Sequence, residues 1–286
     1  MRWPSRSTTA LRRLYGTDKS RAIAFLDQDP VDAVLARASI DRIGIGPSSA
    51  LAQFEPGTRT IRALAWDSGN LIPLGFDAEG LESLADTVLA HGKLCGSLVG
   101  PADQVLGLWD LLEYSWGPSR EVRPRQYSMV IDHPPLLEPD PTVRPARPAE
   151  QALVLPASVA MFTEEVGYDP TVYGNSYAGR ASRLIRDGMT YIKTGPALEG
   201  AGTRVIFKAD VGAFAGGVAQ IQGVWVAPDM RNRGIGGAAM AAVVDHVRAS
   251  FSPLVSLYVN DFNAGAVKVY QRVGFRIVGE WATVML

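Results

Sequence analysis

The chain has 286 residues, of which 47% are hydrophobic, and it carries 28 basic and 29 acidic side chains for a formal net charge of −1. This length is enough for two domains that each bury a core. The near-neutral charge and the hydrophobic content argue against a disordered chain and against a nucleic-acid partner.

Residues that commonly bind metals are sparse. The single cysteine, Cys95, cannot form an internal disulfide or a thiolate site, and its apolar neighbours favour a buried position. The histidines at 91, 133 and 246 are far apart in sequence, so we expect no metal. Because no window approaches 18 uncharged apolar residues, we expect a cytoplasmic, soluble protein with no membrane partner.

The first half of the chain predicts an α/β domain over residues 1–132. It begins with a hairpin about the Asp-Ser-Gly-Asn turn at 67–70 and continues with alternating helices and strands. The expected elements are strand, strand, helix, strand, helix and strand, at 61–66, 71–75, 81–91, 94–99, 103–114 and 125–131.

A proline-rich segment follows. Residues 133–148 contain six prolines, which cannot lie inside a helix or in a central strand. We therefore predict a linker at 133–148 and a second domain at 149–286. The first helix of that domain is expected to end near the acidic pair Glu164 and Glu165.

The most informative segment lies near the C-terminus. The apolar run Val224, Trp225 and Val226 predicts a strand, and an uncharged stretch from Gly237 predicts a helix. Between them lies a turn rich in arginine and glycine, made of Arg231, Asn232, Arg233, Gly234, Ile235 and Gly236. Unpaired N–H groups at a helix start bind phosphate, and glycines let the oxygens approach the backbone.

Two other glycine-rich nucleotide sites fit this turn poorly. In a dinucleotide-binding fold the first glycine ends the strand, whereas here 227–233 intervene before Gly234. The chain also contains no Gly-x-x-x-x-Gly-Lys-Ser/Thr motif, which a P-loop requires.

The chain after the turn predicts helix, strand and helix, at 237–249, 254–259 and from Asn263 to Gly274. Asn263 is a suitable N-cap for the last of these helices. Its spacing to Ala266 and Tyr270 places all three side chains on one helical face.

Together, Arg-x-x-Gly-x-Gly and Asn-x-x-Ala-x-x-x-Tyr-x-x-x-Gly-Phe resemble the two signatures of the GNAT superfamily of N-acyltransferases, over residues 143–286. The resemblance implies an α/β fold with a mixed sheet, and acetyl-CoA as co-substrate. It assigns residues 231–237 to the pyrophosphate and Asn263 to the pantetheine arm, and it makes Tyr270 the acid that protonates the departing thiolate. Backbone N–H groups of Val224–Val226 are expected to hold the thioester carbonyl.

The general base is harder to assign. Many GNAT relatives carry a glutamate on the strand before the turn, but this chain has Gln220 and Gln222 there, and amides accept protons poorly. Glu164 and Glu165 are the alternatives, since they are expected where relatives bind the acceptor, although an exposed helix end would explain them equally well. Glu280, expected in a final hairpin, is a weaker candidate.

The two halves share one element order, which is hairpin, helix, strand, helix and strand. In the first half, however, Asp77 and Glu79 stand where the arginine-glycine turn would be, and carboxylates would repel a pyrophosphate. We therefore expect two GNAT-like domains, of which the first is degenerate. An unrelated α/β domain with the same element order is the alternative.

The sequence thus predicts transfer of an acetyl group from acetyl-CoA to a primary amine of a small molecule, peptide or protein. Transfer of a longer acyl group, and a CoA-binding sensor or scaffold without turnover, remain open. Neither the acceptor nor the oligomeric state is indicated.

Overall fold

The structure, a computed structural model, describes residues 10–46, 49–93 and 95–286. The chain forms two compact units. The first unit comprises the chain up to Ser128 together with Val278–Leu286, and the second unit comprises Met129–Ile277. Within the described residues, no helix has both the length and the apolar character needed to cross a bilayer.

The first unit contains a mixed sheet with the strand order β1-β2-β3-β4-β5-β12-β6. Its strands are β1 (Arg12–Arg13), β2 (Ala50–Phe54), β3 (Ile61–Asp67), β4 (Asn70–Leu74), β5 (Ser97–Pro101), most of β12 (Arg276–Met285) and most of β6 (Glu121–Ile131). Its helices are α1 (Lys19–Leu26), α2 (Pro30–Ile43), α3 (Ala78–His91) and α4 (Ala102–Trp116). The neighbours β4 and β5 are parallel, and the β3–β4 hairpin forms about the predicted turn.

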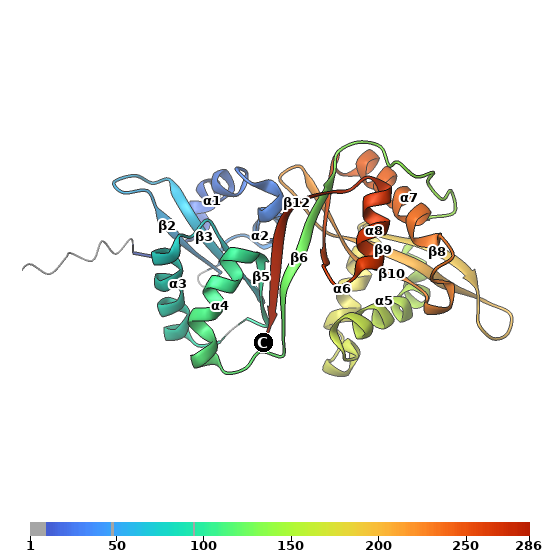
Figure 1. Cartoon of the computed structure of the whole chain (residues 1–286), viewed down its shortest axis with the longest axis horizontal. Helices are drawn as coiled ribbons and strands as arrows, with labels where there is room; N and C mark the ends of the chain where they lie inside the picture. The colour runs from blue at the N-terminus through green and yellow to red at the C-terminus, as the bar shows by residue number, and fades with distance from the viewer. Residues whose placement is uncertain (1–9, 47–48, 94) are drawn as a thin grey trace, which may run out of the picture. The chain divides into compact units, whose positions relative to one another are not determined.

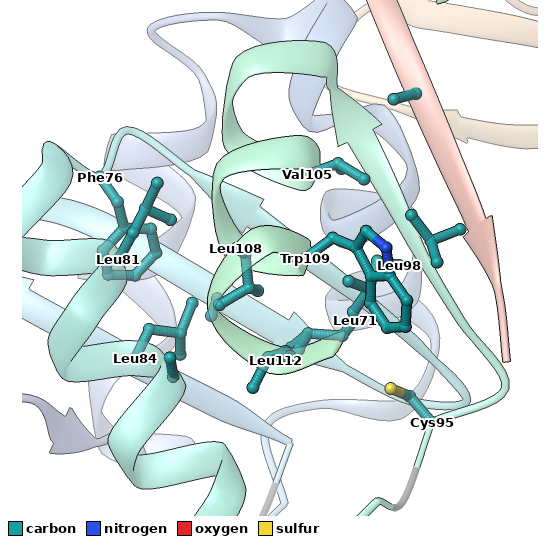
Figure 2. Close-up of a cluster of buried hydrophobic side chains, with 14 of the residues drawn as sticks. Leu71, Phe76, Leu81, Leu84, Cys95, Leu98, Val105, Leu108, Trp109 and Leu112 are labelled. Atoms are coloured by element: carbon teal, nitrogen blue, oxygen red, sulfur yellow. The ribbon is translucent and has the colours of Figure 1, made fainter. Parts of the chain in front are cut away.

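Helices α3 and α4 bury one apolar face against this sheet (Figure 2). Fully buried Leu84, Leu98 and Leu108 lie at the centre of the cluster. Cys95 is buried at its margin, where desolvation raises the pKa of the thiol to about 11, as expected of a packing residue. The strand expected at 94–99 runs from Ser97 to Pro101, and Leu94 lies outside the described residues.

The last strand of the chain completes the sheet of the first unit. Residues Trp281–Met285 of β12 pair antiparallel with Pro101–Ser97 of β5. Trp281 is buried, and its indole N–H donates to Asp32 of α2 at 2.7 Å. Residues 125–131 were predicted to close this sheet, and the chain end was predicted to belong to the second domain. The structure differs because the burial and the pairing of β12 from Val278 onward are provided by the first unit.

The second unit has the strand order β6-β11-β10-β9-β8-β7. Its further strands are β7 (Arg144–Pro145), β8 (Thr190–Pro196), β9 (Thr203–Ala215), β10 (Val218–Val226) and β11 (Leu254–Asn260). Its helices are α5 (Gln151–Val166), α6 (Ser176–Arg186), α7 (Ile235–Ser250) and α8 (Ala264–Val273), with short 3-10 turns η2 (Pro148–Glu150), η3 (Pro170–Tyr173) and η4 (Pro228–Met230). Figure 1 shows α5 and α7 on opposite faces of β9 and β10, and both helices contact these strands.

The proline-rich segment is held against the second unit. The N–H of Leu136 donates to the carbonyl of Val273 at 2.8 Å, and the N–H of Asp140 donates to that of Ala238 at 3.0 Å. Prolines exclude a helix here, but the remaining N–H groups still bind the second unit. Residues 133–148 therefore belong to that unit, which begins at Met129.

Candidate active site

Strands β10 and β11 separate part-way along their length. Their parallel pairing joins Val218–Gln220 to Leu254–Ser256, and both strands continue beyond it, to Val226 and Asn260. In this later part, β10 has no regular pairing with β11 among the described residues. This is the stretch expected to hold the thioester.

A β-bulge in β10 marks the separation. Gln222 lies opposite Asp210 of β9 and Trp225 lies opposite Lys208, so that two residues of β10 face one of β9. Gly223, inside the bulge, has a φ of +57°, a conformation in which a side chain is unfavourable.

The direction of the backbone after the bulge follows from one hydrogen bond. The N–H of Ala227 donates to the carbonyl of Ile206 in β9 at 2.9 Å. Because successive N–H groups of a strand point to opposite edges, those of Val224 and Val226 point away from β9. The predicted thioester contacts are therefore oriented toward the β11 side.

The predicted phosphate turn lies at the start of α7. Asn232 and Gly234 both have positive φ, of 60° and 78°, and Gly234 is the N-cap of the helix. A Cβ atom added at Gly234 would meet nothing within 4 Å, and one at Gly236 would lie 3.6 Å from Val226. The first N–H groups of α7 thus lie beside open space, as a phosphate site requires. Gly237 differs, since a Cβ atom there would lie 3.0 Å from Leu137.

Arg231 is engaged within the protein. Its Nε donates to the carbonyl of Val226 at 3.0 Å, and its guanidinium forms an ion pair with Glu164 at the end of α5. Glu164 also accepts a hydrogen bond from the indole N–H of Trp225 at 3.0 Å. Glu164 therefore contacts the arginine-glycine turn and the preceding strand rather than standing free. Arg233 is exposed.

Glu165, the next residue of α5, has partners on β11 and α8. Its carboxylate accepts a hydrogen bond from the amide of Asn260, the last residue of β11, at 3.4 Å. Burial raises the pKa of the Tyr270 hydroxyl well above its ordinary value, and the nearby charge of Glu165 raises this pKa further. The Glu165 charge thus acts on Tyr270, and Glu164 and Glu165 have different hydrogen-bond partners.

The second signature folds as its pattern predicts. The Asn263 side chain accepts from the N–H of Ala266 at 3.2 Å and caps α8, which ends at Gly274 with a φ of 116°. Tyr270 lies on the second turn of this helix, only 8% exposed, with its ring edge-on to Phe275. Glu280 lies within the continuous strand β12, in the part that belongs to the first unit, so the final hairpin expected around it does not form.

Several polar residues on the α5 side of the sheet were not predicted. Lys208 is completely buried, and its Nζ lies 2.6 Å from the Asp210 carboxylate. Gln220, at the strand position where a glutamate was expected, is buried and accepts from the amide of Gln222 at 3.0 Å. The alternation Phe-Lys-Ala-Asp in β9 indicates a strand with one polar face, but only tertiary contacts show that this face is covered.

The first unit fills the equivalent positions with its own side chains. At the start of α3, the Asp77 carboxylate accepts from the N–H of Gly80 at 2.8 Å and pairs with Arg62 at 3.2 Å. Beside the end of β4, the Gln104 side chain both accepts from the N–H of Phe76, at 2.8 Å, and donates to its carbonyl, at 2.9 Å. Side chains of the first unit therefore engage the backbone at the start of α3 and beside the end of β4.

Over the residues with described positions, no cluster of three or more histidine, cysteine, aspartate or glutamate side chains is arranged to hold a metal ion.

Comparisons with known proteins bear on this geometry. Residues 185–275 match the model of the acetyltransferase (GNAT) family, and residues 52–154 match a domain of unknown function, DUF4081. An uncharacterized N-acetyltransferase of Methanocaldococcus jannaschii is 38% identical over 58 residues, which are 20% of this chain and 26% of that protein. The chain thus spans about a quarter of the length of this curated relative.

Solved structures resemble nearly the whole chain. A GCN5-related N-acetyltransferase from Sphaerobacter thermophilus has a TM-score of 0.59 at 18% identity, covering 96% of this chain and 94% of that one. A tandem GNAT protein from the clavulanic acid biosynthesis pathway has a TM-score of 0.51 at 13% identity, covering 96% and 97%. At these identities the likeness shows the fold, which is that of two GNAT-like halves. Residues 185–275 therefore form a GNAT-family domain, and the fold of the whole chain resembles that of a tandem GNAT protein.

Proposed function

We propose that the protein is an acyl-CoA-dependent N-acyltransferase that transfers an acetyl group from acetyl-CoA to a primary amine. The observation that carries this proposal is the separation of β10 from β11 beside the open glycine turn of α7. The match of residues 185–275 to the GNAT family indicates acyl transfer. That the acyl group is acetyl and that the acceptor is a primary amine are proposed in addition.

The donor would bind along β10 and the start of α7. N–H groups of the first turn of α7, with Arg231 and Arg233, suit the pyrophosphate. The N–H groups of Val224 and Val226 suit the arm and the thioester carbonyl. Because the Asn263 side-chain oxygen caps α8, this residue would contact the pantetheine arm through its amide nitrogen.

The chemistry requires one proton to be delivered and one to be removed. The amine nitrogen attacks the thioester carbon, the carbon–sulfur bond breaks, and the thiolate takes a proton from Tyr270. The raised pKa of Tyr270 keeps this hydroxyl protonated through the neutral range. The amine gives its own proton to solvent near Glu165, since amides stand at the strand position of the base, and the tyrosinate regains a proton from solvent.

The acceptor is proposed to be a primary amine on a small molecule, peptide or protein. The Glu165 carboxylate, near Tyr270, would favour an acceptor that arrives as a cation. Binding of the acceptor is not expected to involve Glu164 directly, because this residue pairs with Arg231.

Release of CoA thiol from acetyl-CoA, followed across a panel of polyamines, amino acids, aminoglycosides and peptides, tests the proposal. We expect release that depends on the amine and yields an equimolar amide product. Binding of acetyl-CoA without release by any amine would instead support a CoA sensor. Absence of binding would contradict the assignment of the turn.

A further inference from the structure

Beneath the bulge of β10 lies an ion pair whose lysine is fully buried and whose aspartate is largely buried. The ammonium of Lys208 lies 2.6 Å from Oδ2 of Asp210 and 3.3 Å from the carbonyl oxygen of Gly223. The Lys208 side chain is 0% exposed and that of Asp210 is 13% exposed. Thr190 of β8 donates to the other carboxylate oxygen at 2.8 Å.

We propose that Lys208 and Asp210 are positioning residues, which hold the bulge at Gly223 so that the N–H groups of Val224 and Val226 face the thioester. This inference rests on the proposed function for the identity of the ligand. Neither side chain is proposed to touch the reacting atoms.

The cost of burial points to a specific role for the ammonium. Removing a lysine and a carboxylate from water carries a large desolvation penalty, and apolar residues of similar size often stabilise a protein equally well. A packing role alone therefore does not account for the pair. What the ammonium provides, and a methionine would not, is a charged donor to the Gly223 carbonyl.

That carbonyl belongs to a residue displaced from the regular ladder. In a bulge, two residues face one, and the extra residue loses its regular partner on the neighbouring strand. A buried carbonyl without a partner is unfavourable, and Lys208 supplies the hydrogen bond. The bulge in turn sets which N–H groups of the following residues point away from β9.

The surroundings leave little room for another arrangement. A Cβ atom added at Gly223 would lie 3.2 Å from both Lys208 Nζ and Asp210 Oδ2 and 3.0 Å from the Met161 methyl group of α5. The ion pair, α5 and the bulge are thus in close mutual contact. A change in the pair is expected to move the backbone of Val224 before it disturbs the rest of the sheet.

The test compares two double variants. Lys208→Met with Asp210→Leu removes the pair but keeps the volume, whereas Lys208→Gln with Asp210→Asn keeps hydrogen-bonding groups without charge. We expect both to fold. The Met/Leu variant should lose about tenfold or more in kcat with an unchanged KM for the acceptor, and the Gln/Asn variant should stay within about threefold of the original protein.

A control pair separates this effect from the loss of any ion pair. Lys193 and Asp140 form an ion pair in the same unit, with side chains 20% and 14% exposed. Lys193→Met with Asp140→Asn should leave kcat unchanged. Thr190→Val is a milder variant, to be used if the Met/Leu variant does not fold. It removes one hydrogen bond to Asp210 and should lower kcat about threefold.

Amide hydrogen exchange over residues 221–227 gives a readout that needs no turnover. We expect faster exchange at Ala227, whose N–H donates to Ile206 of β9, in the Met/Leu variant and no change there in the control pair. A folded Met/Leu variant with full kcat, or with unaltered exchange, would overturn the positioning role. An original protein that releases no CoA thiol, while its Met/Leu variant still shows the faster exchange, would refute the proposed function and leave the structural role intact.

Discussion

At the residue scale, the site combines a buried hydroxyl with amides where a carboxylate was expected. Gln220 and Gln222 cannot take a proton from an amine at neutral pH, and both are engaged in hydrogen bonds, the second with Arg180 at 3.2 Å. Proton removal must therefore use another group. Glu165 is the carboxylate whose charge reaches Tyr270.

Replacing Tyr270 by phenylalanine should separate chemistry from binding. The ring keeps its packing against Phe275, so affinity for acetyl-CoA should hold, while kcat should fall about 10²-fold because the thiolate loses its proton donor. Single-turnover kinetics and calorimetry measure the two effects. Tyr191→Phe is a matched control, since Tyr191 is a buried tyrosine of the same unit, on β8. Full kcat in Tyr270→Phe would reduce this residue to a packing role.

The two neighbouring glutamates should have different effects. Glu164→Gln weakens the exposed ion pair with Arg231, which frees the guanidinium for phosphate. Because an exposed pair contributes about 0.5 kcal/mol, the KM for acetyl-CoA should fall about twofold. Glu165→Gln should instead raise the KM of a cationic acceptor several-fold. Steady-state kinetics on both substrates check this, and identical effects of the two variants would contradict the separation.

At the element scale, the glycines at the start of α7 differ in what an added methyl group would contact. Gly236→Ala adds a methyl group at ordinary contact distance from Val226, so stability should hold. The methyl group would nevertheless lie where phosphate approaches the helix start, and the Kd for acetyl-CoA should rise about tenfold or more. Gly179→Ala is the control, because this exposed glycine of α6 has open space at its Cβ position and lies outside the turn. Equal affinities of the two variants would argue against a phosphate site.

The junction of β7 with α5 predicts a pH dependence of stability. Hydrogen bonds from Arg144 lower the pKa of Glu150 from 4.5 to about 2. A carboxyl whose pKa is lowered by folding stabilises the fold above its unfolded pKa. That stabilisation is lost as the pH falls from 4.5 toward 2. Because the pair is partly exposed, we expect about 1 kcal/mol.

Urea denaturation of Glu150→Gln checks this window. The variant should be less stable than the original protein at pH 7, and the difference should shrink as the pH approaches 3. Glu199→Gln, at an exposed loop, should show no such trend. A difference that stays constant with pH would mean that Glu150 contributes through packing alone.

Local signals in the sequence were sufficient for the elements that carry the motif. Asn263 caps α8, Gly274 ends it in a left-handed conformation, and the turn before α7 has the predicted form. Each of these depends on residues close together in the sequence. The roles of Glu164 and Lys208 depend on partners about 65 and 15 residues away, which no local pattern specifies.

At the scale of the whole molecule, the sheet of the first unit is completed by the end of the chain. Strands 125–131 and 276–285 have similar apolar alternation, so the sequence does not indicate which of them lies beside β5. The pairing of β12 with β5 makes the last residues part of the first unit's stability. Removal of 281–286 is therefore expected to destabilise that unit.

Internal hydrogen bonds explain why the first half would not bind CoA. Asp77 caps α3 and Gln104 binds the backbone of Phe76, so internal groups take the place of a phosphate and an amide arm. We propose on this basis that each chain has one site for acetyl-CoA, in the C-terminal half.

Calorimetric titration of the full chain with acetyl-CoA tests this central claim most directly. The account predicts a stoichiometry of about one per chain, with binding weakened by Gly236→Val and unaffected by Asp77→Asn. Two equivalents per chain, or binding that Asp77→Asn weakens and Gly236→Val does not, would contradict it.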